Sequence, residues 1–139
     1  MRTITKYLIG FAVTAAILTV VFRFCLSYFL ANKDFIMASI SGVIYFVAMF
    51  TSGFFWGKKD GEYLPIYDVG FRFHFSTYLI FIVISELWFI LGINSVYEQI
   101  NVVHYTAMIW GFFILIHFFI YIYYRRKSIN GLNKNDLFE

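Results

Sequence analysis

The sequence contains few charged residues. Only 14% of its 139 residues are Asp, Glu, Lys or Arg, against about 25% in an ordinary soluble domain, and 61% are hydrophobic. Its mean hydropathy is +0.75. A soluble domain of this length could not bury so many hydrophobic side chains without leaving large apolar patches on its surface. The scarcity of charge therefore predicts a single-domain integral membrane protein that crosses the bilayer several times.

Other scarcities exclude further classes of protein. The only cysteine, Cys25, excludes an internal disulfide and leaves an intermolecular one open. A net charge of +3 argues against a nucleic-acid partner. The chain has no glycine-rich phosphate loop, nucleophile elbow or zincin motif, and no cysteine pair or acidic cluster typical of a metal site. We therefore expect a non-enzymatic protein without a bound metal.

Four apolar segments are long enough to cross a bilayer, which takes about 20 residues in a helix. They cover residues 7–30, 35–57, 71–93 and 102–124. The connections are short, which favours antiparallel neighbours in an up-down bundle. We expect an all-α transmembrane domain over residues 1–127, a short polar tail over 128–139, and a loop over 58–70 with a turn at residues 59–61.

The basic residues indicate an orientation. Nine of the eleven lie on one side of the predicted spans, and the opposite side has only Lys33, while Arg23 lies within a span. Those nine are Arg2, Lys6, Lys58, Lys59, Arg72, Arg125, Arg126, Lys127 and Lys134. By the positive-inside rule, both termini and the 58–70 loop are predicted to lie in the cytoplasm, with the protein in the inner or plasma membrane.

Arg23 and Glu86 are full charges deep inside apolar spans, where charge is costly without a partner, a water-filled cavity or a nearby interface. At about 1.5 Å per residue, each lies roughly 22–24 Å from the cytoplasmic start of its span. Since these two spans run in the same direction, the residues are predicted to share one height and to form an interhelical salt bridge. Separate accommodation of the two charges and a transport role remain alternatives.

Small residues predict which faces of the helices pack, because they allow helices in lipid to approach closely. On the first span, Ala12, Ala16 and Thr19 share a face with Arg23 and Ser27. Gly42 on the second span and Gly111 on the fourth are predicted to play the same part.

Three histidines raise the question of a cofactor. His74 and His117 fall in the cytoplasmic halves of the third and fourth spans, and paired imidazoles from two helices can ligate haem iron. His104 lies near the outer end of the fourth span, about 140° around the helix from His117. We expect histidines in a polar seam and no cofactor, and haem b remains an alternative.

These features rank three functions. The first is a non-enzymatic subunit or scaffold of a membrane complex, embedded in lipid and associating with copies of itself or with other membrane proteins. The second is a small oligomeric transporter or channel that uses Arg23 and Glu86. The third is a b-type haem membrane anchor.

Overall fold

The computed structural model describes residues 4–62 and 64–130, and the side chains of all of these except 66, 67 and 128–130. It contains four helices: α1 (Lys6–Ala31), α2 (Phe35–Gly61), α3 (Ile66–Ile90) and α4 (Ile100–Asn130). Each includes a stretch long and apolar enough to cross a membrane. The prediction of an all-α, four-span membrane protein is confirmed.

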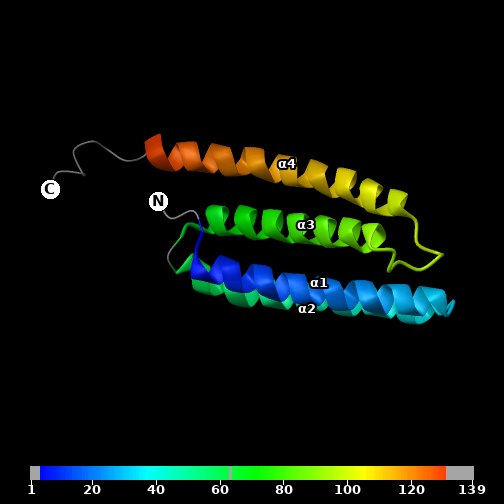
Figure 1. Cartoon of the computed structure of the whole chain (residues 1–139). Helices are drawn as coiled ribbons and strands as arrows, with labels where there is room; N and C mark the ends of the chain where they lie inside the picture. The colour runs from blue at the N-terminus through cyan, green and yellow to red at the C-terminus, as the bar shows by residue number, and fades with distance from the viewer. Residues whose placement is uncertain (1–3, 63, 131–139) are drawn as a thin grey trace.

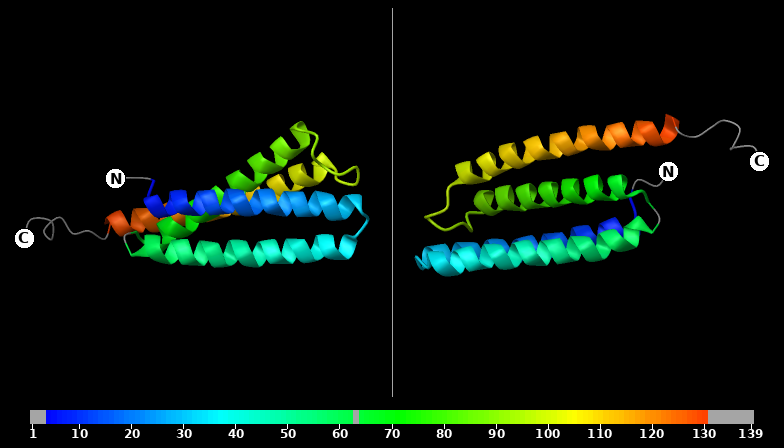
Figure 2. Two further views of the ribbon diagram at one scale, coloured as in Figure 1. Left: turned by 60° about the horizontal axis from the view of Figure 1, so that its bottom comes forward. Right: turned by 180° about the vertical axis from the view of Figure 1, so that it is seen from behind.

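The four helices lie side by side, and successive helices run in opposite directions (Figure 1). Helix α1 packs along α2 on one side and α3 on another, α2 touches α3 more lightly, and α4 packs against α3. In the described part of the chain, the backbone of α4 does not come close to α1 or α2. Figure 2 shows α3 crossing α1 obliquely and, from behind, α3 lying between α2 and α4. The bundle is therefore open between α2 and α4.

Local sequence explains where the helices begin and end. Thr5 and Asp34 cap α1 and α2 by accepting hydrogen bonds from the backbone N–H groups of Leu8 and Met37, at 3.1 and 3.0 Å. Pro65 precedes α3, a position that does not require its missing N–H. Gly92 follows α3 with φ +66°, a left-handed conformation that glycine adopts without strain.

The connection between α2 and α3 is shorter than the sequence predicted. Helix α2 continues through Gly61 and α3 begins at Ile66, so the predicted turn at residues 59–61 is wrong. The extra helical turn buries Asp60 completely and places its Oδ2 atom 3.9 Å from Nη1 of Arg72. This contact joins α2 to α3. It therefore could not be predicted from the turn propensity of the segment alone. At the other end of the chain, α4 extends to Asn130, and the rest of the predicted tail lies outside the described residues.

A stripe of every fourth residue on α1 forms the buried centre of the bundle. It consists of Phe11, Ala15, Thr19, Arg23 and Ser27. Thr19, Arg23 and Ser27 are residues of the predicted packing face, whereas Ala12 and Ala16 are half-buried beside the stripe and Ala15 takes the central position.

The apolar core lies at the end of the bundle that holds the amino terminus. There the Phe11 and Phe73 rings pack with centroids 4.6 Å apart, next to Ala15 and Val69. The stripe thus changes from apolar to polar along its length, and its polar half leads to the candidate site.

Candidate functional site

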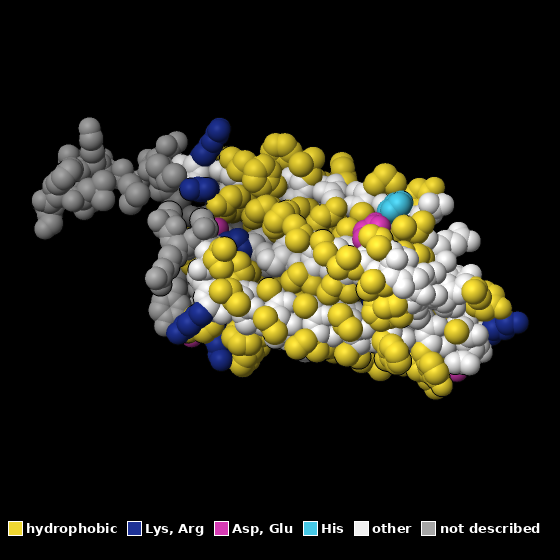
Figure 3. Space-filling view, in the orientation of Figure 1, with side chains coloured by type: hydrophobic (Ala, Val, Ile, Leu, Met, Phe, Trp, Pro, Cys, Tyr) yellow, Lys and Arg dark blue, Asp and Glu magenta, His cyan; other side chains and the backbone are white. Residues whose placement is uncertain are grey.

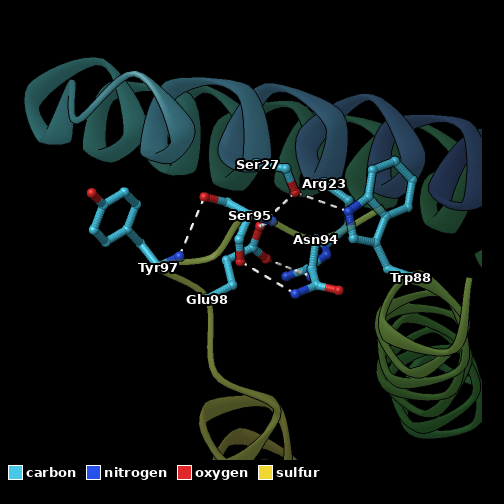
Figure 4. A network of polar contacts seen from close by, with 7 residues as sticks. All are labelled: Arg23, Ser27, Trp88, Asn94, Ser95, Tyr97 and Glu98. Carbon is cyan, nitrogen blue, oxygen red and sulfur yellow. Dashed lines mark hydrogen bonds and ion pairs between the residues drawn. The ribbon is translucent and has the colours of Figure 1, made fainter. Parts of the chain in front are cut away.

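Arg23 forms a buried ion pair with Glu98. Its Nη2 atom lies 2.7 Å from Oε2 of Glu98, and both side chains are only 5% exposed. Glu98 belongs to the connection between α3 and α4, which folds back over the end of α1 (Figure 4). A buried charge needs a close partner and further hydrogen bonds to offset its lost hydration, and Glu98 provides the partner.

The other oxygen of Glu98 is also satisfied. Ser27 donates its hydroxyl to Oε1, and the backbone N–H of Ser95 donates to the same atom at 2.9 Å. Trp88 on α3 donates its indole N–H to Oγ of Ser27 at 2.9 Å. The network therefore joins α1, α3 and the α3–α4 connection (Figure 4), and we call Arg23, Ser27, Trp88, Ser95 and Glu98 the outer lock.

Aromatic rings complete the surroundings of the guanidinium group. Its central carbon lies 5.4 Å from the ring centroid of Phe89 and 6.0 Å from that of Trp88, within the range of cation–π attraction. In the part of the chain that the structure describes, the Nε atom of Arg23 has no hydrogen-bond partner. Charge pairing and ring contacts thus keep Arg23 inside the protein and away from lipid.

The predicted Arg23–Glu86 salt bridge is corrected by this geometry, because Arg23 pairs with Glu98. Glu86 was chosen because it has the same height as Arg23 along parallel helices. That choice assumed that the partner of Arg23 lies on a helix. The α3–α4 connection instead brings an acidic side chain down onto α1. Glu98 is the only acidic residue of that connection, at the same end of the bundle as Arg23, and this was the signal that could have identified it.

Glu86 pairs with His104 across α3 and α4. The distance from Oε1 to Nε2 is 3.0 Å, and the side chains are 32% and 52% exposed. The pair is ionic only when His104 is protonated. In Figure 3, a histidine and an acidic side chain adjoin each other on a face otherwise covered largely by hydrophobic side chains. The second predicted intramembrane charge therefore also has a partner, but on the protein surface.

His74 and His117 come together across the same two helices, as the sequence suggested they could. Their ring centroids are 5.2 Å apart and the rings are tilted by 51°. Axial imidazoles bind haem iron from opposite faces of the macrocycle. Two rings in contact leave no gap for a macrocycle between them, so this arrangement does not fit a haem group. His104 is engaged by Glu86 and does not join the pair.

The predicted glycines both face an aromatic side chain of a neighbouring helix. A Cβ atom added at Gly42 would lie 4.0 Å from the Phe22 ring, and one at Gly111 would lie 3.2 Å from the Tyr78 hydroxyl. Tyr78 donates that hydroxyl to the backbone oxygen of Ala107 at 3.2 Å. Gly111 thus makes room for a hydrogen bond between α3 and α4.

A second polar cluster, at the opposite end of the bundle from the outer lock, was not anticipated from the sequence. Nη1 of Arg72 lies 3.9 Å from Asp60 and 3.8 Å from Asp68, so one guanidinium group bridges the end of α2 and the start of α3. The Asp60 side chain is completely buried, and neither oxygen has a hydrogen-bond partner among the described residues. Within the described residues, no group of three or more His, Cys, Asp or Glu side chains is placed to hold a metal ion.

No protein-family model, curated protein or solved structure matches this chain. Its interpretation therefore depends on its own geometry, in which polar side chains join helices to one another and to a connecting segment.

Proposed function

We propose that this four-span membrane protein is a non-enzymatic subunit or scaffold that binds transmembrane helices of other proteins or of further copies of itself. The observation that carries the proposal is the Glu86–His104 pair, which is partly exposed on an apolar surface. Ionisable residues in membrane spans almost always face the protein interior or a water-filled cavity, because lipid solvates them poorly. A partner helix over this face would give the pair such an environment.

The neighbouring side chains suit a helix partner. Val83 and Leu87 on α3, and Met108 on α4, are exposed apolar residues within one turn of the pair. An apolar surface around a central polar pair resembles the helix interfaces of membrane proteins, in which polar side chains hydrogen-bond across close packing.

The orientation is part of the proposal. Lys58 and Lys59 lie in the last turn of α2, and Lys127 lies in the last turn of α4. These two ends lie on the same side of the bundle (Figure 1). The basic residues support a cytoplasmic location for this side and for both termini, in the inner or plasma membrane.

Cysteine cross-linking tests the proposed interface. In a Cys25→Ser background, Met108→Cys places a thiol one turn from His104, whereas Ile109→Cys places it about 140° around α4 from His104. The two side chains are matched in exposure, at 61% and 63%. We expect the Met108→Cys protein to form a cross-linked product in native membranes and the Ile109→Cys protein to form much less.

A pull-down in mild detergent with mass analysis then identifies the cross-linked species. A higher mass that is lost in a Glu86→Leu, His104→Leu double variant supports the proposal. The proposal is contradicted if the protein stays monomeric in native membranes, or if it cross-links equally at the two positions.

One observation still supports the alternative function, a small oligomeric transporter or channel. The interface of α3 and α4 carries two titratable pairs, Glu86–His104 and His74–His117. Arg23 no longer supports it, because its side chain is 5% exposed and tied to Glu98. Ion or proton flux in reconstituted vesicles that falls in Glu86→Gln would favour transport over the scaffold. A Soret band in the visible spectrum of the purified protein would instead revive the haem hypothesis.

A further inference from the structure

A lateral cavity of about 610 Å³ lies along α3, between α2 and the amino-terminal half of α4. It exists because α2 and α4 flank α3 without approaching each other, as the rear view in Figure 2 shows for their ribbons. Its volume is within the range of about 300–1,000 Å³ that is typical of small-molecule sites. Since its walls are membrane-spanning helices, a ligand dissolved in the bilayer would enter it sideways.

The lining is apolar and without full charges. Among the described residues it includes Phe11, Phe73, Phe81 and Met49, and no Asp, Glu, Lys or Arg. A charged or zwitterionic head group would lose its hydration in this cavity without gaining an ionic partner.

Two nitrogen-containing rings on the cavity wall make no hydrogen bond to the described residues. Thr77 and Thr106 donate their hydroxyls to backbone oxygens of their own helices, and Tyr45 is paired with Thr19. By contrast, His74 and Trp110 have only ring contacts among the described residues. Tyr and Trp side chains normally find a partner for their polar atom when they are shielded from water. These two rings are therefore available to a ligand.

We propose that this cavity binds a membrane-dissolved amphiphile with an uncharged, hydrogen-bonding head and an apolar tail, the class to which diacylglycerols belong. His74 and Trp110 contact the head, and the aromatic wall contacts the tail. The proposal does not depend on the scaffold function, because neither Glu86 nor His104 lines the cavity.

Photoaffinity labelling of the purified full-length protein in phosphatidylcholine nanodiscs tests the assignment. Three probes carry the same diazirine-bearing acyl chain on diacylglycerol, on phosphatidylcholine or on phosphatidylglycerol, and the labelled residues are mapped by mass spectrometry. We expect diacylglycerol to label the cavity residues about fivefold more than either phospholipid, the factor that one additional net hydrogen bond provides.

Variants locate the labelling. Thr77→Phe fills the cavity and should abolish the preference, whereas Leu79→Phe adds the same ring about 200° around α3, outside the cavity lining, and should leave it intact. His74→Leu and Trp110→Phe keep the cavity open and should each reduce the preference. Circular dichroism shows which variants retain their helices. If Thr77→Phe does not fold, the two ring variants decide.

Three results would overturn the proposal. Equal labelling by all three probes means that bulk lipid fills the cavity without selection, and a preference for phosphatidylglycerol means that charge selects the occupant. Labelling that appears in purified protein but is absent in native membranes means that a partner helix occupies the cavity. The last result would contradict the amphiphile site but not the scaffold function.

Discussion

The two helical hairpins of this protein are held together by different means. In the α1–α2 hairpin, helices approach closely: a Cβ atom at Gly10 would lie only 2.7 Å from the Trp56 indole, and the Phe22 and Tyr45 rings stack at 4.5 Å. In the α3–α4 hairpin, contacts recur between polar or titratable side chains, from Glu86–His104 at one end to His74–His117 at the other.

The difference has a physical cause. Lipid provides no hydrophobic driving force for helix association, so helices in a membrane are joined by close packing or by polar contacts. The first hairpin depends mainly on packing, which is insensitive to charge, together with one hydrogen bond between Thr19 and Tyr45. The second combines aromatic contacts, such as those of Trp110 with Tyr78 and Phe81, with groups that change protonation or find other partners. It is the hairpin that carries the proposed interface. The outer lock connects the two, because Arg23 and Ser27 belong to α1 while Trp88 and Glu98 belong to α3 and the connection after it.

Breaking the outer lock should have the largest effect. Glu98→Leu leaves the Arg23 guanidinium buried without its partner, and we expect a loss of about 3–5 kcal/mol in the free energy of unfolding. Unfolding in mixed micelles with increasing sodium dodecyl sulfate, followed by circular dichroism, measures it. The exchange Arg23→Glu with Glu98→Arg should recover part of the loss, whereas Arg23→Glu with Glu86→Arg should not. If only the second combination recovers stability, Arg23 pairs with Glu86, as the sequence suggested.

The close packing of the first hairpin should be the next most sensitive feature. Gly10→Val forces the Trp56 ring to move, and we expect a loss of about 1–3 kcal/mol, as for other overpacked sites. Gly42→Val is the matched control, since its Cβ atom would lie 4.0 Å from Phe22, an ordinary contact. The same micelle titration compares them. Equal losses would show that packing in this hairpin is looser than the contact at Gly10 implies.

In the second hairpin, the hydrogen bond from Tyr78 to Ala107 should contribute less. Tyr78→Phe removes only the hydroxyl, and we expect a loss of about 0.6 kcal/mol, the average for hydrogen bonds between helices in membranes. The control is Tyr105→Phe, an exposed tyrosine on α4, which should change stability little. A loss comparable to that of Gly10→Val would remove the contrast between the hairpins.

The exposed pair should have the smallest effect on folding. A double-mutant cycle of Glu86→Gln and His104→Gln should give a coupling energy of no more than about 0.6 kcal/mol in the isolated protein, the average for hydrogen bonds between helices in membranes. The same cycle measured on partner binding should give a larger value if a helix covers the pair. Equal values in the two measurements would show that the pair lies uncovered in the complex.

The sequence determined the features that depend on local composition. The four spans follow from runs of apolar residues matched to bilayer thickness, and the structure places a helix at each of them, with boundaries shifted by at most six residues. Thr19 and Arg23 were placed on the packing face by helical periodicity alone, and both are buried. The approach of His74 to His117 followed from antiparallel helices joined by a short connection.

Tertiary structure decided which charges meet. Arg23 and Glu98 are separated by 75 residues, and their contact depends on how the α3–α4 connection folds over α1. The Asp60–Arg72 contact likewise depends on α2 staying helical through a segment whose composition favours a turn. Helix formation in lipid is enforced residue by residue, because each backbone polar group must find its hydrogen bond within the segment. The pairing of side chains is not: it depends on where separate segments come to lie, and only the packed structure establishes that.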